Sequence, residues 1–233
     1  MQKTKLLAGA LSALIVLSGC NMSNTAKGGI IGGGGGAVLG ALIGNAAGNT
    51  AVGTLIGGAV GAGAGVLIGN KMDKAKKAAQ QVENAQVETV KDSNGLDAVK
   101  VTFDSGILFA TGKSTLSTDA KNSLSDFSQV LKDNADMDVN VYGYTDNQGW
   151  RNATATESQL KNKALSLDRA QAVVNYLNGL GVSYSQFKSV VGYGEENPKA
   201  SNSTAAGQAE NRRVEIYMYA SQAMISAAQA QAK

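Results

Sequence analysis

The chain has 233 residues, with 21 basic and 18 acidic side chains, one cysteine and no histidine. The lack of histidine excludes Ser-His-Asp and Cys-His catalysis, and it removes the commonest zinc ligand. If residues 1–19 are removed as a signal, Lys3 and Lys5 go with them and 19 basic side chains face 18 acidic ones. Nucleic-acid binding would need basic residues clustered on one face, which the sequence does not indicate. We expect no cofactor and no metal.

Residues 1–19 are predicted to be a secretory signal. Lys3 and Lys5 form a basic start, and the apolar stretch Leu6–Leu17 follows. This stretch is too short to cross a bilayer as a helix, which needs about 20 residues. A basic start, a short apolar stretch and small residues at the cut are typical of a secretory signal, which is excluded from the fold.

Cys20 is the predicted lipidation site. The sequence Leu17-Ser18-Gly19-Cys20 resembles the lipobox of bacterial lipoproteins, in which the cysteine receives a diacylglycerol and its new amine is acylated. Cys20 has no disulfide partner in the chain, so in an exported protein it needs a role of this kind. Several acyl chains give durable membrane attachment. Asn21 replaces the Asp that often retains such proteins in the inner membrane, which favours the outer membrane. An ordinary signal peptide with a chance cysteine is the alternative.

Residues 28–70 are predicted to form a glycine-rich helical hairpin after a lipidated linker, residues 20–27. The stretch has no charged residue, and its glycines recur every four residues in two sets, at positions 32–48 and 53–69. Glycine costs about 1 kcal/mol per residue in a helix relative to alanine. Close backbone packing, which small residues at every fourth position allow in lipid, would offset that cost. The array resembles the glycine-zipper segments of some outer-membrane lipoproteins. A hairpin in the membrane, an oligomerising hairpin in the periplasm and a flexible linker remain open.

Two polar segments flank the expected domain. Residues 71–95 are predicted to be a polar helical stalk, because Met72 to Val90 is rich in Lys, Ala, Gln and Glu. Asn94-Gly95 is a turn signal at its end. Residues 221–233 are rich in Ala and Gln and are predicted to be a loose helical tail.

Residues 96–220 are predicted to form one α+β domain. Alternating apolar and polar residues predict strands, and apolar residues three or four apart predict helices. The predicted strands are 99–103, 139–144, 189–193 and 213–219, and the predicted helices are 117–131 and 160–177. The order βαβαββ predicts helices packed on one face of a mixed four-stranded sheet.

Four short motifs follow one another along residues 142–216. They are Gly143-Tyr144-Thr145-Asp146, Leu165-Ser166-Leu167-Asp168-Arg169-Ala170, Gly192-Tyr193-Gly194-Glu195-Glu196-Asn197-Pro198 and Asn211-Arg212-Arg213. Their order and spacing resemble the OmpA-like C-terminal domain that OmpA, the Pal lipoprotein and flagellar stator proteins share. The resemblance covers about residues 98–220. It implies a domain that binds peptidoglycan without cleaving it, and therefore a protein that is not an enzyme.

The resemblance also implies a ligand site for diaminopimelate, with Asp146 and Arg169 at its centre. Diaminopimelate carries an ammonium and a carboxylate on one carbon, so Asp146 can accept from the ammonium and Arg169 can donate two parallel bonds to the carboxylate. The other residues implied are Asn162, Leu165, Thr145 and Arg212. Taken alone, Asp146 equally suits a turn, and Arg169 a surface salt bridge with Asp168 or Glu157. Neither is expected at a core-facing position. The sequence leaves open which of Arg212 and Arg213 approaches the ligand.

Three features depart from the family pattern. The stretch between Asp146 and Arg169 is longer than usual around residues 150–159, which a polar loop accommodates at small entropic cost. Trp150 in this loop either stacks on a sugar or caps the loop. Tyr144 stands where many members carry histidine, and Ala110 stands where many carry aspartate.

The sequence thus predicts an outer-membrane lipoprotein on the periplasmic face of a Gram-negative bacterium. It would tether the outer membrane to the wall by binding peptidoglycan non-covalently. The alternative is a membrane oligomer or assembly factor that is driven by the glycine array and positioned by the wall-binding domain. That alternative requires a homo-oligomer formed through residues 28–70.

Overall fold

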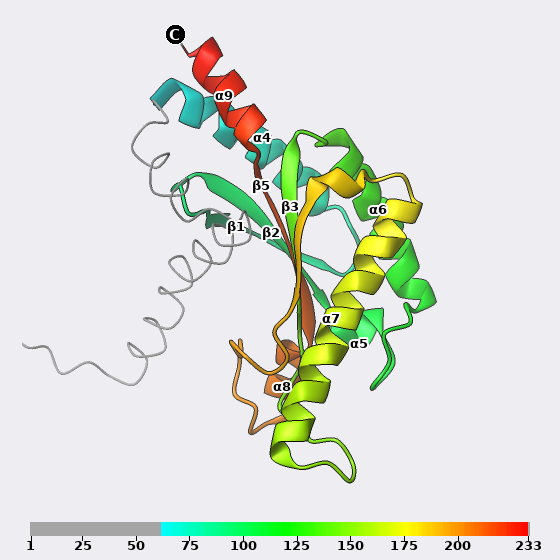
Figure 1. Cartoon of the computed structure of the whole chain (residues 1–233). Coiled ribbons are helices and arrows are strands. Elements are labelled where there is room, and N and C mark those ends of the chain that lie inside the picture. Colours follow the sequence, from blue (N-terminus) through cyan, green and yellow to red (C-terminus); the bar gives the residue numbers. More distant parts are fainter. Residues whose placement is uncertain (1–61, 233) are drawn as a thin grey trace, which may run out of the picture. The chain divides into compact units, whose positions relative to one another are not determined.

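The computed structural model describes residues 62–232, so the predictions for residues 1–61, including Cys20 and most of the glycine array, lie outside it. The elements in chain order are α4 (Ala62–Ala79), β1 (Ala85–Lys91), β2 (Asp97–Asp104), α5 (Ser105–Leu108), α6 (Thr118–Asp133), β3 (Met137–Tyr144), α7 (Ala155–Gly179), a 3-10 turn (Tyr184–Gln186), β4 (Phe187–Gly192), α8 (Ala205–Asn211), β5 (Arg213–Ala220) and α9 (Gln222–Gln231) (Figure 1).

The strands form one mixed sheet in the order β1-β2-β5-β3-β4. Only β3 and β4 run parallel, and the other neighbouring strands are antiparallel. The predicted α+β class, with helices on a mixed sheet, is therefore confirmed. The predicted number of strands is wrong, because the sheet has five strands and not four.

The additional strand is β1, where the sequence predicted helix as far as Val90. β1 pairs along its whole length with β2, from Ala85 opposite Phe103 to Lys91 opposite Asp97. Its side chains are half-buried or exposed, as expected for an edge strand that charged residues protect from further pairing. In the sequence, the polar residues of β1 are of the kinds that are common on the exposed face of a helix. Gly95, with a φ of 75°, lies in the β1–β2 turn, so the turn signal belongs to a hairpin.

α4 is not a free stalk. Buried apolar residues recur along it every three or four positions, which places them on one face against β1, β2 and α9. They are Ala64, Ile68, Met72, Ala75 and Ala79. The described glycines of the array lie beside this face, and a Cβ built on Gly65 would meet no atom within 4 Å. None of the helices between residues 62 and 232 has both the length and the apolar character that a membrane span requires.

The carboxyl-terminal segment is helical as predicted, but it is not loose. Ser221 caps α9, because its hydroxyl accepts from the backbone N–H of Met224 at 3.1 Å. Met224, Ile225 and Ala228 are buried against the core. α9 packs on α4, so the two ends of the described chain lie side by side (Figure 1).

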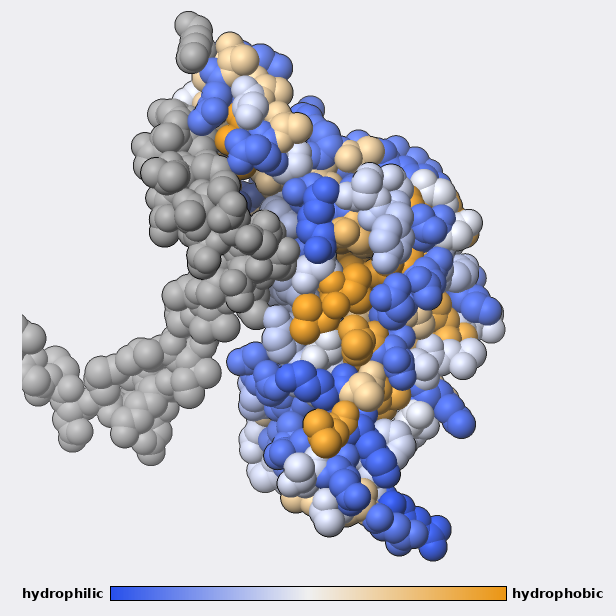
Figure 2. Space-filling view, in the orientation of Figure 1, coloured by the Kyte–Doolittle hydropathy of each residue, from blue (hydrophilic) through white to orange (hydrophobic). Residues whose placement is uncertain are grey.

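The helices α6 and α7 lie on one face of the sheet, and the main core fills the space between. Phe103 of β2 and Phe127 of α6 meet edge to face at 5.7 Å between ring centres. α7 approaches β3 so closely that a Cβ on Gly143 would lie 2.0 Å from the carbonyl oxygen of Ser166. Hydrophobic residues gather near the middle of the face shown in Figure 2, and α7 exposes Leu160 and Leu167. The close contact between Ser166 of α7 and Gly143 of β3 fixes the position of α7 relative to the strand ends.

A second cluster of buried residues belongs to the other set of alternating positions in the strands. Its aromatic members are Tyr142, Tyr144, Tyr217 and Tyr219. Glu215 accepts from the Tyr217 hydroxyl and from Arg213 Nε, both at 2.7 Å. Burial alone would raise the pKa of Glu215, but the charges of Arg213 and Lys100, together with these hydrogen bonds, lower it below its usual value.

Candidate ligand-binding site

The strand pairing brings three chain segments together at one end of the sheet. Arg213, the first residue of β5, pairs with Asp104 at the end of β2 and with Tyr144 at the end of β3. One residue beyond this row lie Ser105, Thr145 and Arg212. Their side chains therefore gather where the strands end, although they are far apart in the sequence.

α7 contributes a second wall. Asn162, Leu165 and Arg169 are three and four residues apart, so they share one face of the helix. The helix begins at Ala155, earlier than predicted, and Thr154 and Glu157 close a capping box at its start. Half of the inserted stretch 150–159 is thus a helical extension, and only the part before Thr154 is loop.

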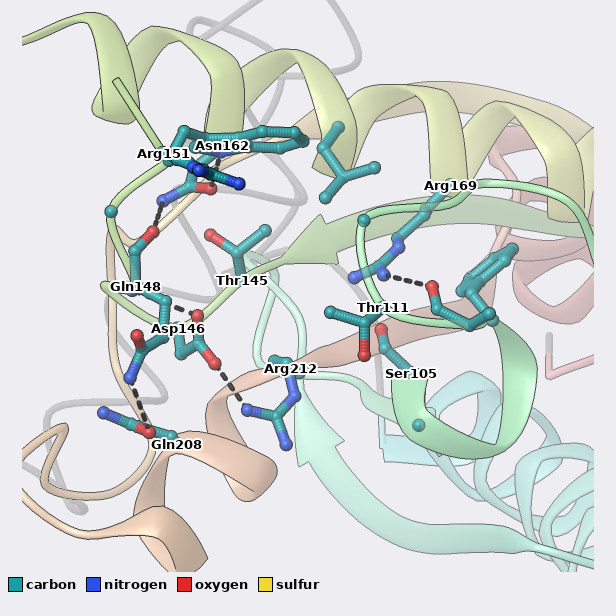
Figure 3. A pocket seen from close by; sticks show the side chains of 17 residues that line it. Ser105, Thr111, Thr145, Asp146, Gln148, Arg151, Asn162, Arg169, Gln208 and Arg212 are labelled. Atoms are coloured by element: carbon teal, nitrogen blue, oxygen red, sulfur yellow. Dashed lines mark hydrogen bonds and ion pairs between the residues drawn. The ribbon is translucent and has the colours of Figure 1, made fainter. Parts of the chain in front are cut away.

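These segments enclose a pocket of about 670 Å³ (Figure 3). Every ligand-binding residue that the sequence predicted lines it: Asp146, Arg169, Asn162, Leu165, Thr145 and Arg212. The other charged residue in the lining is Arg151. Three arginines and one aspartate give the pocket a surplus of positive charge, which favours a ligand with at least one anionic group.

Asp146 is the carboxylate of the pocket and is 6% exposed. Its Oδ2 accepts from Arg212 Nη1 at 2.5 Å, and its Oδ1 accepts from the Gln148 backbone N–H at 3.1 Å. Asp146 therefore forms the turn expected of an Asx residue and also presents a carboxylate to the pocket. A carboxylate has about four lone-pair positions, so these two bonds leave capacity for another donor.

Arg169 is 3% exposed, contrary to the expectation that it avoids buried positions. Its Nε donates to the Lys113 carbonyl at 2.9 Å and its Nη2 to the Ala110 carbonyl at 3.4 Å, and the guanidinium lies over the Phe109 ring at 5.1 Å. Burial, and then the charge of Arg212, lower its pKa. Within the described residues it has no ion pair with Asp168 or Glu157. The guanidinium has five N–H donors, so Nη1 and one N–H of Nη2 remain for a ligand.

Asn162 and Trp150 shape the rim of the pocket. The Asn162 amide accepts from Trp150 Nε1 at 2.7 Å and donates to the Gln148 carbonyl at 3.1 Å. Trp150 also lines the pocket. Asn162 thus positions the loop that carries Gln148, and Trp150 both caps the loop and faces the cavity.

Of the two adjacent arginines, Arg212 reaches the pocket and Arg213 does not. Arg213 is buried, pairs with Glu215, and lies over the Tyr144 ring at 3.8 Å from its centre. Tyr144 therefore belongs to the buried aromatic cluster on the opposite face of the sheet and does not line the pocket. Ala110 contributes its carbonyl to Arg169, a role that does not depend on its side chain.

Asn211, which stands directly before the two arginines, fixes the backbone at the end of α8 through its side chain. Its Oδ1 accepts from the backbone N–H groups of Lys199 and Ala200 at 2.7 and 2.9 Å. It thereby ties the end of α8 to the preceding loop and sets where Arg212 emerges. Gln208 of α8 lines the pocket and accepts from Gln148 Nε2 at 3.0 Å.

Sequence reasoning missed Ser105, which lines the pocket from the start of α5. It follows Asp104 at the end of a strand, and strand ends are natural ligand positions, so that signal was available. Ser105 and Thr145 are 1% and 5% exposed. Neither hydroxyl has a hydrogen-bond partner among the described residues.

Comparison with known proteins gives two matches along the chain. Residues 108–212 match the OmpA family, and residues 1–73 match the YMGG-like Gly-zipper family. The probable lipoprotein YiaD of Escherichia coli K12 is 38% identical over 120 residues, which are 52% of this chain and 51% of that protein. The peptidoglycan-binding protein ArfA of Mycobacterium tuberculosis H37Rv is 44% identical over 86 residues, 37% of this chain and 24% of that protein. The chain thus spans half or less of these relatives' length.

Solved structures of other proteins have a fold similar to that of this chain. The cell wall anchor of the type VI secretion system (T6SS) of Pseudomonas aeruginosa is similar with a TM-score of 0.51 and 27% identity, covering 64% of this chain and 97% of that one. A MotB-like protein of Desulfovibrio vulgaris gives a TM-score of 0.53 at 24% identity, over 68% and 92% of the two chains. The sequence matches identify residues 108–212 of this chain as a domain of the OmpA family, and the solved structures show the same fold.

Proposed function

We propose that this chain is an outer-membrane lipoprotein that binds peptidoglycan non-covalently through diaminopimelate and tethers the membrane to the wall without catalysis. The observation that carries the proposal is the single pocket that holds Asp146 together with Arg169 and Arg212. The names of the similar proteins support it, since they include a peptidoglycan-binding protein, a probable lipoprotein and a cell wall anchor.

The pocket matches the side-chain end of diaminopimelate in charge and donors. The ligand ammonium binds Asp146, and the neighbouring carboxylate accepts from the free N–H groups of Arg169 and Arg212. Because Arg169 already donates to two backbone carbonyls, its guanidinium is fixed before the ligand arrives. Such preorganisation reduces the entropy lost on binding.

Arg212 is paired with Asp146, and its side chain is 36% exposed. The ligand ammonium therefore approaches the Asp146 carboxylate, which is already paired with the Arg212 guanidinium. The approach is favourable because the ligand's own carboxylate adds a second anion beside Arg212. A bare amine without that carboxylate would increase the positive charge of the pocket, so the pocket selects for the zwitterion.

The membrane attachment in this proposal rests on Cys20, which lies in the segment that the structure does not describe. Cys20→Ala is expected to leave an uncut or soluble periplasmic precursor. Fractionation of cells that express the variant and the parent tests this. Normal processing and full retention in the membrane fraction would contradict lipidation at Cys20.

A second candidate function follows from the match of residues 1–73 to the YMGG-like Gly-zipper family. In this alternative the glycine array drives oligomers in the membrane, and the wall-binding domain only positions them. Chemical crosslinking of the full chain and of a variant that lacks residues 28–61 distinguishes the two. Detergent-resistant oligomers that disappear with the deletion would favour the alternative.

The test of wall binding is co-sedimentation of the full chain, purified in detergent, with isolated sacculi. Asp146→Asn keeps the size of the side chain but removes its charge. We expect a loss of about 2 kcal/mol, or roughly thirtyfold in affinity, because a charged hydrogen bond to the ligand becomes a neutral one. Free diaminopimelate should release the parent protein from the pellet.

Asp168→Asn is the matched control, because Asp168 is exposed on α7 and the same charge is removed. It should sediment like the parent. If Asp146→Asn also sediments like the parent, or free diaminopimelate releases nothing, the proposed site is wrong. Soluble wall fragments released by the parent protein would contradict the absence of catalysis.

A further inference from the structure

The Ser105 hydroxyl is the one feature of the pocket that neither the fold nor the predicted ligand residues explain. Ser105 is 1% exposed, and its Oγ has no hydrogen-bond partner among residues 62–232. Buried hydroxyls are normally paired, and an unpaired one destabilises the folded state. The stability of the domain therefore does not explain why a serine occupies this position.

The backbone around Ser105 is fully hydrogen-bonded, so the residue is held in place. Its N–H donates to the Arg212 carbonyl at 2.9 Å, and its carbonyl accepts from the Phe109 N–H at 2.8 Å. In Figure 3 its side chain lies below Arg169 and to the right of Arg212, and all three line the same pocket. The hydroxyl thus belongs to a pocket with two guanidinium groups, where a ligand anion is attracted.

We propose that Ser105 donates its hydroxyl proton to the ligand carboxylate that Arg169 and Arg212 attract, and that it thereby helps the pocket to prefer diaminopimelate to lysine. This inference rests on the proposed function and adds a specificity-determining residue to it. A hydroxyl can turn its proton towards whichever acceptor is present. In a pocket with two guanidinium groups, the acceptor that this environment favours is a carboxylate.

The two candidate amino acids differ at the point that Ser105 would contact. The side-chain end of lysine has the ammonium of diaminopimelate but lacks the carboxylate on the same carbon, whereas the α-carbon of free lysine carries both groups. Loss of the hydroxyl should therefore weaken binding of diaminopimelate and leave binding of the lysine side chain unchanged. A hydrogen bond to a charged group justifies an expected loss of about tenfold.

Trp150 provides the measurement, because it is the only tryptophan in the chain and it lines the pocket. The full chain in detergent is titrated with meso-diaminopimelate and separately with Nα-acetyl-lysine amide, whose only ammonium is on the side chain, while tryptophan fluorescence is followed. The variants are Ser105→Ala and the control Ser128→Ala. Ser128 is also buried, but its hydroxyl donates to the Ser125 carbonyl at 2.7 Å within α6, away from the pocket.

We expect Ser105→Ala to bind diaminopimelate about tenfold more weakly, to bind the blocked lysine as the parent does, and to melt at the same or a higher temperature. Ser128→Ala should bind both ligands like the parent. Equal loss for both ligands, no loss for diaminopimelate, or a lower melting temperature together with weaker binding would each overturn the role of Ser105. If the parent itself fails to bind diaminopimelate, the proposed function falls as well.

Discussion

Arg212 and Arg213 are adjacent in the sequence, but their side chains point in opposite directions because successive residues of extended backbone face opposite sides. Arg212 reaches the pocket and pairs with Asp146, with 36% of its side chain exposed. Arg213 is buried on the other face with Glu215. The first lines the pocket, and the second holds the end of β5 to its neighbours.

Alanine substitutions should separate these two roles. Arg212→Ala is expected to lower the affinity for sacculi about tenfold and to destabilise the fold less than Arg213→Ala, because 36% of the Arg212 side chain is exposed, although the buried Asp146 carboxylate loses its ion partner. Arg213→Ala leaves the Glu215 carboxylate buried without its main partner and should cost about 3–5 kcal/mol. Urea unfolding and co-sedimentation measure the two effects. Equal destabilisation by both variants would contradict this assignment.

The predicted site residues were found because short motifs at strand and helix ends identify a family, and the strand pairing then brings them together. The sequence left Arg212 and Arg213 unresolved because only the pairing of β5 shows which side each faces. It gave no sign that Arg169 is buried, since that depends on the Ala110 and Lys113 carbonyls of a distant loop. Ser105 was missed because a single serine after a strand is common in any sequence.

At the scale of elements, the contact between α7 and β3 links the fold to the site. Glycine at position 143 lets the helix backbone approach the strand, and Gly192 of β4 has a similar role, since a Cβ there would lie 2.3 Å from the Leu167 nitrogen. α7 carries Asn162 and Arg169. Any displacement of this helix therefore moves one wall of the pocket relative to Asp146.

Gly143→Ala should force such a displacement, because its Cβ would lie 2.0 Å from the Ser166 carbonyl oxygen. We expect a destabilisation of about 1–3 kcal/mol, as for other overpacked positions, together with weaker binding of sacculi. Thermal unfolding and co-sedimentation provide the two measurements.

Gly179→Ala is the matched control, because a Cβ at that last residue of α7 meets no atom within 4 Å. It should be neutral or slightly stabilising, since alanine is less flexible in the unfolded chain. If both glycine variants unfold like the parent, the close approach of α7 to β3 does not constrain the fold.

The elements that the sequence predicted correctly have strong periodic patterns and lie within the sheet or over it. α7 and β5 are examples, since apolar residues recur every three or four positions in the first and every second position in the second. β1 was predicted as helix because its Lys, Gln and Glu residues are typical of an exposed helix and its alternation of apolar and polar residues is short, and only pairing with β2 makes it a strand. α8 is too short for any periodic signal.

At the scale of the whole described domain, the pocket and the α4–α9 pair lie at opposite ends of β5. Arg213, next to the pocket, begins this strand, and Ala220, next to α9, ends it (Figure 1). A strand rises about 3.3 Å per residue, so the two ends are roughly 23 Å apart. The pocket and α9 are therefore connected through the sheet, but their side chains do not contact each other.

Deletion of residues 221–233 should accordingly weaken the fold and leave the affinity of the pocket unchanged. Met224 and Ile225 are buried by α4 and the sheet, and burial of each such side chain contributes about 1.5–3 kcal/mol. The truncated chain should thus lose at least about 3–6 kcal/mol of stability and melt at a lower temperature, since the buried face of α4 also becomes exposed. Titration with diaminopimelate, followed by Trp150 fluorescence below the melting temperature, should give the dissociation constant of the parent. A truncated chain that melts like the parent would show that α9 does not stabilise the core. A weaker dissociation constant would show that the two ends of the sheet are coupled.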